Sequence, residues 1–335
     1  MRIIIPMAGW GSRLRPHTLT VPKPMVPIAG KSIVQRLVED LAHNCAEAID
    51  EIVFIIRQDF GSEIEQQLLN IAENLKTSGR IAYQDVPLGT AHAILCAENS
   101  LNGHVIVAFA DTLFTIKNQL DTNADGVVYV QKVEDPSAFG VVKMNEQNVI
   151  TDFIEKPKEF VSDLAIIGIY YFKDGANLRS ELQYLIDNNI MVKGEYQLTT
   201  ALETIKNKGL SLIPGEVVEW LDCGNKVATV YTNQRILELV KDKEALVSPQ
   251  AQVVNSVIIP PVYIGPDAII ENSIVGPHVS IGSKTIVRNS MIRNSMVQSN
   301  TLIEDAQCKD SMIGNSVKLK GRWDDYSIGD YSVLN

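Results

Sequence analysis

The 335-residue sequence has few cysteines and lacks long apolar runs. The cysteines lie far apart and form no CxxC pair, which argues against a zinc knuckle and against a disulfide framework; they are Cys45, Cys96, Cys223 and Cys308. No apolar run approaches the roughly 18 residues of a membrane span, and the N-terminus has no signal-peptide hydrophobic region. These absences predict a cytoplasmic protein with no membrane partner.

Basic residues are also scarce, because 30 Lys and Arg face 40 Asp and Glu and leave a formal net charge of -10. A general nucleic-acid binder needs an extended basic surface, so we expect no nucleic-acid partner. Acids, however, are missing from one stretch. Met1 to Val38 contains no Asp or Glu, and its cations are Arg2, Arg13, Arg15, Lys23, Lys31 and Arg36. An acidic protein that keeps such a segment is expected to bind an anion there.

Strand and helix patterns alternate through the first 110 residues. The apolar spacing predicts strands at Arg2 to Met7, Glu51 to Arg57, Ile81 to Gln84 and His104 to Ala110, and helices at Ser32 to Leu41, Ile64 to Leu75 and Thr90 to Asn99. This alternation indicates an α/β domain with a mostly parallel sheet covered on both faces. The ligand of such a domain is expected at the carboxyl ends of its strands.

From Gly126 to Phe172 several strand patterns follow one another, which predicts a β-rich insertion. Helical patterns return at Asn177 to Asp187 and Tyr196 to Lys206, and a last helix ends at Leu239. We therefore expect a first domain over residues 1–240 and a linker over 241–250.

From Val253 onward a repeat replaces the helical pattern. Asn-Ser recurs at 255, 272 and 289, and again at 294 and 315, while small or branched apolar residues recur every five or six positions. This spacing predicts a parallel β-helix of about four coils over residues 251–320, followed by a C-terminal tail over 321–335. A meander or sandwich would instead show longer strands with alternating apolar residues.

The stretch Met7 to Met25 fails both familiar phosphate-loop patterns. Leu14 stands where a dinucleotide loop needs its third glycine, and Met25 stands where a P-loop ending in Gly30 to Ser32 needs its first. What remains is a loop stiffened by four prolines from Pro16 to Pro27, with bare backbone that can approach phosphates and cations that can hold them. The residues concerned are Gly9, Gly11, Arg13 and Lys23.

These residues resemble a family signature. GWGSRLRP followed by PKPMVPIAGK closely resembles the GxGxRLxP and downstream KP of the sugar-1-phosphate nucleotidyltransferases, the nucleoside-diphosphate-sugar pyrophosphorylases. Other elements of the same family appear in its order over about 240 residues: Pro87 to Ala91, Ala110-Asp111, Phe139 to Val142, Glu155 to Pro157 and Trp220 to Gly224. Three positions depart from the commoner pattern, with Ala8, Ser12 and Ala110 in place of Gly, Thr and Gly.

The resemblance implies a Rossmann-like, mostly parallel mixed sheet and a role for each matching residue. Arg13 and Lys23 would be catalytic, holding the leaving β- and γ-phosphates and the α- or attacking phosphate. The nucleotide would also contact Ala8, Gly9, Gly11, Ser12, Gln84, Gly89 and Thr90. The sugar phosphate would contact Gly140, Glu155, Lys156 and Glu195, the last near the start of an expected helix. Asp111 and Asp222 would bind Mg²⁺, which usually takes one or two carboxylates with phosphate oxygens and water.

The substrates implied are a nucleoside triphosphate and a sugar 1-phosphate. The segment around Gln84 and Gly89 resembles the uridylyl and thymidylyl branches, which favours UTP or dTTP and leaves a mannose-1-phosphate guanylyltransferase open. Glucose 1-phosphate is the default sugar, with N-acetylglucosamine 1-phosphate next.

The C-terminal repeat resembles the left-handed hexapeptide-repeat β-helices attached to many of these enzymes, and predicts a homo-oligomer formed through it. In some relatives this domain is an acetyltransferase with a catalytic histidine, for which only His278 is available in the repeat. A bifunctional enzyme and a non-catalytic regulatory or assembly subunit therefore remain as alternatives.

Overall fold

The computed structural model describes residues 1–117, 119–120, 122–321 and 325–334. The described residues form two compact units. The first, here called the sheet unit, consists of Met1–Gly9 and Leu37–Trp220; the second, the β-helix unit, consists of Trp10–Arg36 and Leu221–Asn335. Most of the acid-free segment, Trp10–Arg36, thus belongs to the same unit as the C-terminal repeat, although some 200 residues separate them in sequence.

The sheet unit is built on parallel strands with buried residues on both faces. β1 (Arg2–Pro6) lies between β4 (Glu51–Ile56) and β6 (Val105–Ala108), and β5 (Ser78–Tyr83) pairs with β4, all in parallel. The crossovers carry α1 (Ile33–Asn44), α2 (Ser62–Asn74) and α3 (Thr90–Leu95). The predicted α/β alternation is confirmed.

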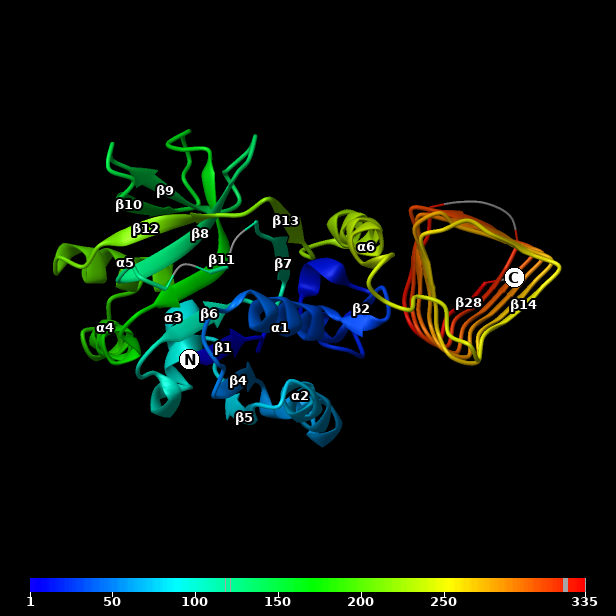
Figure 1. Ribbon diagram of the computed structural model, residues 1–335, viewed down its shortest axis with the longest axis horizontal. Coiled ribbons are helices and arrows are strands. Elements are labelled where there is room, and N and C mark those ends of the chain that lie inside the picture. The colour runs from blue at the N-terminus through cyan, green and yellow to red at the C-terminus, as the bar shows by residue number, and fades with distance from the viewer. Residues whose placement is uncertain (118, 121, 322–324, 335) are drawn as a thin grey trace. The chain divides into compact units, whose positions relative to one another are not determined.

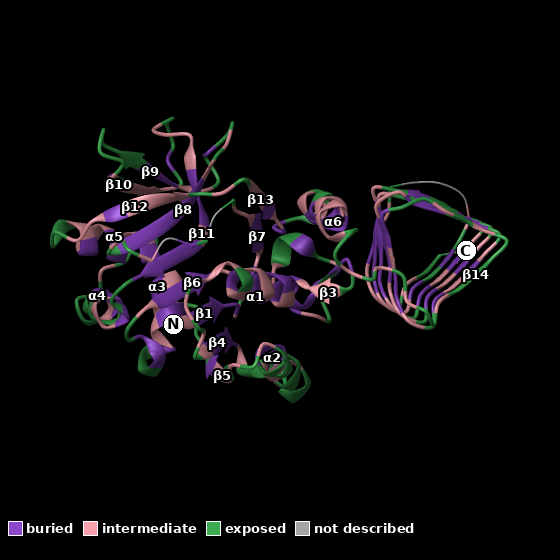
Figure 2. Ribbon diagram, in the orientation of Figure 1, coloured by how far each residue is buried: buried purple, intermediate pink, exposed green. Residues whose placement is uncertain are grey.

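The β-rich insertion extends the same sheet rather than forming one of its own. β11 (Leu164–Phe172) pairs antiparallel with β6, β8 (Gly126–Lys132) and β9 (Gly140–Met144). β10 (Ile150–Glu155) continues from β9, and β12 (Leu212–Glu216) continues from β8. Within the described residues this makes a nine-stranded mixed sheet. β8 and β11 are almost wholly buried (Figure 2), because α4 (Gly175–Asp187) and α5 (Leu198–Asn207) supply further apolar residues to this core.

One predicted element differs in length. The helix expected at Thr90 to Asn99 ends at Leu95, and a separate 3-10 turn follows at Glu98–Ser100. The backbone N–H of Ala97 donates to Ile94 and that of Ser100 donates to Ala97, which are the three-residue spacings of a tighter helix. The apolar spacing alone does not distinguish the two winding modes.

The C-terminal repeat forms stacked parallel sheets, and Figure 1 shows the triangular outline of its coils. One face stacks β14 (Gln252–Val254), β17 (Ile269–Glu271), β20 (Ile286–Arg288), β23 (Leu302–Glu304), β26 (Lys318–Lys320) and β28 (Val333–Leu334). The second stacks β15 (Val257–Ile258), β18 (Ile274–Val275), β21 (Met291–Arg293) and β24 (Gln307–Lys309). The third stacks β16 (Val262–Ile264), β19 (Val279–Ile281), β22 (Met296–Val297), β25 (Met312–Ile313) and β27 (Ser327–Ile328).

These sheets are those of a left-handed parallel β-helix, as predicted. Among the described residues the faces hold six, four and five strands, so the stack exceeds the four coils expected. The expected tail over 321–335 contains β27 and β28, and its residues 322–324 and 335 lie outside the described part of the chain.

The Asn-Ser repeat has a structural cause. Asn255, Asn272 and Asn289 adopt positive φ angles of 46°, 49° and 48° at a corner of the coils, a conformation that asparagine tolerates better than most residues. The serine that follows each one accepts a hydrogen bond from the next coil, as when Ser290 N–H donates to Ser273 Oγ at 3.1 Å. The repeat is therefore a ladder of hydrogen bonds between coils.

Two further pairs of short strands and a last helix lie outside the sheets described so far. β7 (Thr112–Thr115) and β13 (Glu219–Asp222) precede α6 (Lys226–Val240), and β2 (Pro27–Ile28) pairs with β3 (Lys31–Ser32) beside the acid-free loop. Across the described ranges of the chain, every helix is too short or too polar to cross a membrane.

Candidate nucleotide and sugar-phosphate site

The acid-free loop is organised by the contact between Gly11 and Lys23. Gly11 has a φ of 78° and caps a short 3-10 turn, Ser12–Leu14, while its carbonyl accepts from the Thr18 hydroxyl at 2.8 Å. A Cβ atom at Gly11 would lie 2.5 Å from the Cβ of Lys23, so a larger residue cannot stand there without moving the lysine. A Cβ at Gly9, by contrast, would meet no atom of the described residues within 4 Å, which leaves the backbone there open to an approaching group.

The loop's two predicted catalytic cations differ in environment. Lys23 is 7% exposed and stands between Pro22 and Pro24. It is the first residue of a 3-10 turn, Lys23–Met25. Arg13 is exposed on the preceding turn, beside the exposed Ser12. The loop therefore offers one lysine held in place by its surroundings and one arginine that can swing toward a ligand.

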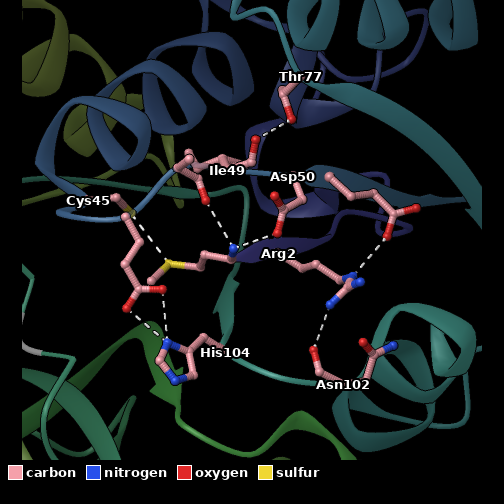
Figure 3. Close-up of polar contacts among 11 residues, drawn as sticks. Arg2, Cys45, Ile49, Asp50, Thr77, Asn102 and His104 are labelled. Atoms are coloured by element: carbon pink, nitrogen blue, oxygen red, sulfur yellow. Dashed lines mark hydrogen bonds and ion pairs between the residues drawn. The ribbon is translucent and has the colours of Figure 1, made fainter.

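Three other cations of the acid-free segment are engaged elsewhere. Arg2 lies at the start of β1, where it donates to the Asn102 carbonyl at 2.9 Å and approaches Glu51 at 3.6 Å (Figure 3). Lys31, the lysine of the P-loop-like sequence, contacts Glu244 at 3.0 Å, and Arg36 contacts the same carboxylate at 3.4 Å. The rejection of a P-loop at this position agrees with that pairing.

In the sheet unit, Gln84 is held by a hydrogen-bond pair that the sequence did not reveal. Its Nε2 lies 3.1 Å from the Gly89 carbonyl and 3.1 Å from His92 Nδ1. The carbonyl can only accept, which identifies this atom as the amide nitrogen, and His92 Nδ1 must then accept as well. His92 is therefore neutral with its proton on Nε2, in keeping with burial, which lowers its pKa. His92 lies three residues after Gly89, and this spacing was the one signal in the sequence that could have pointed to its contact with Gln84.

Gly89 and Thr90 pack against the start of α5. A Cβ at Gly89 would meet the backbone of Tyr196 at 2.5 Å, and its φ of 114° suits only glycine. The Thr90 hydroxyl accepts from the Leu198 N–H at 2.9 Å and donates to Gln197 Oε1 at 3.3 Å. Glu195 precedes this helix rather than lying in its first turn, and accepts from Gln197 at 2.8 Å. These contacts bring Gln84, Gly89, Thr90 and Glu195 into one cluster.

Gly140, Glu155 and Lys156 also lie together, where β9 pairs with β10. Glu155 is the register partner of Gly140, and a Cβ at Gly140 would lie 3.1 Å from Glu155 Oε2. Lys156 follows with a φ of 47°, its N–H donating to the Phe139 carbonyl at 3.1 Å and its Nζ 3.7 Å from Glu155. The Lys156 side chain is 57% exposed, so it can reach a ligand phosphate.

The two predicted metal carboxylates follow strands. Asp111, half-buried, lies between β6 and β7, where Phe109 and Thr112 both bond to β11 through Gly168 and Ile167. Asp222 ends β13, and its Oδ1 accepts from the Gly224 N–H at 2.9 Å. The described residues contain no cluster of three or more His, Cys, Asp or Glu able to hold a metal. Two carboxylates fit Mg²⁺ only where phosphate oxygens and water complete its shell.

The predicted residues are divided between the units. Ala8, Gly9, Gln84, Gly89, Thr90, Asp111, Gly140, Glu155, Lys156 and Glu195 belong to the sheet unit, and Gly11, Ser12, Arg13, Lys23 and Asp222 belong to the β-helix unit. The base- and sugar-type elements thus lie in one unit and the loop cations in the other.

His278, the candidate acetyltransferase residue, is bound within the β-helix unit. Its Nε2 lies 2.6 Å from Glu238 Oε1 on α6, and its side chain is 19% exposed. This contact gives His278 a structural role in joining α6 to the coils.

Comparison with known proteins places this geometry in a family. Residues 2–238 match the model of the nucleotidyl transferase family. The chain is 30% identical over 267 residues to the bifunctional protein GlmU of Methanococcus maripaludis, a match that covers 77% of this chain and 60% of that relative. It is 31% identical over 247 residues to the low-salt glycan biosynthesis nucleotidyltransferase Agl11 of Haloferax volcanii, covering 71% and 66%. The chain thus spans about 60% of the length of its GlmU relatives.

A solved structure from Bacillus anthracis, provisionally named a glucose-1-phosphate thymidylyltransferase, shares the fold. Its TM-score is 0.59 at 24% identity, and the match covers 72% of this chain and 96% of that one. This chain belongs to the nucleotidyl transferase family, and carries a parallel β-helix after the family domain.

Proposed function

We propose that this protein transfers a nucleotidyl group from a nucleoside triphosphate to a sugar 1-phosphate and releases pyrophosphate. The observation that carries the proposal is the buried Lys23, held against Gly11 in a segment that contains no acid. A lysine ammonium donates charge-assisted hydrogen bonds, which suits it to a phosphate oxygen.

The reaction requires charge neutralisation rather than a strong base. An oxygen of the sugar phosphate attacks the α-phosphorus, a new P–O bond forms, and the bond to the β-phosphate oxygen breaks. A phosphate monoester has a second pKa of about 6 and is mostly dianionic at neutral pH, so the nucleophile needs no deprotonation. The barrier comes from repulsion between anions and from positioning them in line.

Each cation then has its own task. Lys23 holds the α-phosphate or the attacking phosphate from a fixed position, Arg13 follows the departing β- and γ-phosphates, and Lys156 holds the sugar phosphate. Asp111 and Asp222 would hold Mg²⁺, which neutralises phosphate charge when bound. Fixed charges aimed at the reacting phosphates stabilise the transition state without reorganising water.

The Gln84 hydrogen bonds bear on the choice of base. Both amide hydrogens are engaged, by Gly89 and His92, so Gln84 offers the base its carbonyl oxygen, an acceptor. Uracil, thymine and guanine carry an imino N–H at the centre of the pairing edge, whereas adenine and cytosine carry a lone pair there. UTP or dTTP is therefore our first choice and GTP the second. Glucose 1-phosphate is the first sugar to test and N-acetylglucosamine 1-phosphate the next.

A matrix of nucleoside triphosphates against sugar 1-phosphates with Mg²⁺, read by pyrophosphate release, tests the proposal. We expect turnover with UTP or dTTP and a sugar 1-phosphate, and at least tenfold less with ATP or CTP. Absence of turnover across the matrix would favour a regulatory or assembly subunit. Acetyl-CoA consumption with an amino-sugar phosphate, lost in His278→Ala, would instead show a bifunctional enzyme. We also propose that the protein forms a homo-oligomer through the β-helix, and light scattering tests this by measuring the molar mass in solution.

A further inference from the structure

The segment that carries Arg13 and Lys23 is fastened to the β-helix at its downstream end. After Lys23 the chain forms the hairpin of β2 and β3, whose turn, Ala29-Gly30, has positive φ angles of 46° and 86°. The Ala29 N–H donates to Asn233 Oδ1 on α6 at 3.0 Å, and the Ser280 hydroxyl on β19 donates to the same oxygen at 2.7 Å. One carboxamide oxygen therefore joins the hairpin turn, α6 and a β-helix strand.

Asn233 is an energetically unfavourable residue at this buried position. It is 0% exposed, and within the described residues its Nδ2 is buried without a hydrogen-bond partner. An unsatisfied buried donor costs about 1–3 kcal/mol, so an apolar or smaller residue would serve packing better. The position of the oxygen, rather than stability, is what this residue supplies.

Other contacts hold the same hairpin turn. A side chain on Gly30 would collide with the ring of Tyr263 on β16, so the turn backbone lies directly against the coils. The Arg36 side chain, 5% exposed, donates to the Ile28 and Ala29 carbonyls at 2.6 and 2.7 Å, and Glu244 neutralises it. Burial by itself would raise the pKa of Glu244, but Arg36 and Lys31 outweigh it and leave that pKa below its ordinary value.

The part of the loop between Arg13 and Lys23 is fastened to the last coil. A Cβ at Gly329 would lie 2.9 Å from Pro16, His17 Nε2 lies 3.3 Å from the Ser327 hydroxyl, and Thr20 donates to Asp330. Between these two attachments, backbone hydrogen bonds link Lys23 to the hairpin. The Val26 N–H donates to the Lys23 carbonyl at 3.0 Å, and the Ile33 N–H donates to the Val26 carbonyl at 3.1 Å.

We propose that the β-helix positions the phosphate-binding loop, and that Asn233 is the positioning residue that joins them. The role rests on the proposed function, because it assigns Lys23 and Arg13 to the phosphates. The β-helix is then part of the reaction's machinery in each chain, beyond any part in assembly: it limits the motion of a loop whose cations must meet the phosphates in line. If the loop were free to move, the rate of the reaction would fall more than the affinity for the sugar phosphate.

Ser280→Ala tests this with little risk to folding, because it removes only the β-helix donor to Asn233. Ser295→Ala is the control for the loss of a buried serine hydroxyl elsewhere in the same coils. The Ser295 hydroxyl donates to the Arg293 carbonyl at 2.7 Å and accepts from the Ser311 N–H at 3.0 Å, and neither partner belongs to the loop. Ser280→Thr restores the hydroxyl and should rescue. Asn233→Ala, the stronger variant, is compared wherever it folds.

Two readouts are needed. Amide hydrogen exchange of residues 10–31, followed by mass spectrometry, should be about tenfold faster in Ser280→Ala and unchanged in Ser295→Ala and Ser280→Thr. In pyrophosphate release, kcat should fall about tenfold in Ser280→Ala, while KM for the sugar phosphate stays within twofold.

Exchange that matches the Ser295→Ala control would overturn the proposal. So would faster exchange with an unchanged kcat, because the position of the loop would then not govern the reaction. If the unmodified protein shows no turnover with any substrate pair, the proposed function fails and with it the role in the reaction, whereas the exchange comparison still decides whether the β-helix holds the loop.

Discussion

Both units of this protein are built on parallel strands, yet they use their polar residues in opposite ways. In the sheet unit the strands are long and buried on both faces, so polar side chains collect where strands end, as at Gln84 and Asp111. In the β-helix each strand has two or three residues, and the polar residues at its corners, such as Asn272 and Ser273, bond to the neighbouring coils. The sheet unit thus gathers polar side chains at strand ends, where we propose that they contact substrates. The β-helix uses its polar side chains to join neighbouring coils.

Removal of the loop lysine should give the largest effect. Lys23→Met, which keeps most of the buried volume, should lower kcat/KM for pyrophosphate release by roughly 100-fold or more, about 3 kcal/mol, because a fixed positive charge at the reacting phosphates is lost. Asp111→Asn should have an effect of the same size, because it removes one of the two carboxylates proposed to hold Mg²⁺. The unfolding temperature should change little. Lys309→Met, an exposed β-helix lysine, is the control. Near-normal rates in Lys23→Met would remove this residue from the site.

His17 should make the β-helix unit sensitive to acid. Burial lowers the pKa of His17 to about 4, with Asp330 raising it and Lys226 lowering it by smaller amounts. The unfolded chain binds a proton near pH 6.5 and the folded chain does not, so stability falls as pH drops below 6.5. Between pH 7 and 5 the loss should be about 2 kcal/mol.

The measurement is urea unfolding at pH 7 and pH 5, in the unmodified protein and in His17→Leu. The leucine variant should lose less stability over this range. Equal losses in the two proteins would show that other groups cause the acid sensitivity.

Ser290→Ala should cost stability without changing activity. The Ser290 hydroxyl donates to Arg288 at 2.6 Å and accepts from the Ala306 N–H at 3.1 Å, so its loss leaves a buried donor unpaired. We expect a loss of about 1.5 kcal/mol in urea unfolding and an unchanged kcat. A lower kcat with an unchanged free energy of unfolding would contradict the view that this ladder of hydrogen bonds serves only the fold.

His92→Leu should show the reverse pattern at the smallest scale. Without the ring nitrogen, one of the two bonds that orient the Gln84 amide is lost, and the ratio of kcat/KM for UTP over CTP should fall about fivefold, equivalent to roughly 1 kcal/mol. Stability should hold, because His92 is half-buried. The two substrates are compared in competition, and an unchanged ratio would mean that Gln84 does not read the base through His92.

Local patterns were enough to predict most elements of the fold. Apolar spacing located the alternating strands and helices, and the 17-residue Asn-Ser period located the β-helix, because each depends on neighbours within a turn or a coil. The patterns did not show that the β-rich insertion joins the first sheet through β11 and β6, since strand pairing over such distances depends on the whole core. They also could not distinguish the helix at Thr90 from the 3-10 turn that follows Leu95.

From the sequence alone we could predict the kind of site: an acid-free glycine and proline loop, strand-end aspartates and a family order that indicates a phosphate-transfer chemistry. Only the folded chain shows that Arg2 pairs with Glu51 and that Lys31 and Arg36 pair with Glu244, because folding brings these residues together from distant parts of the chain. Tertiary structure also decided that Gln84 is oriented by His92, and that the loop is fastened to the β-helix through Asn233. Hydrogen bonds between side chains far apart in sequence leave no local pattern, so only the folded chain shows them.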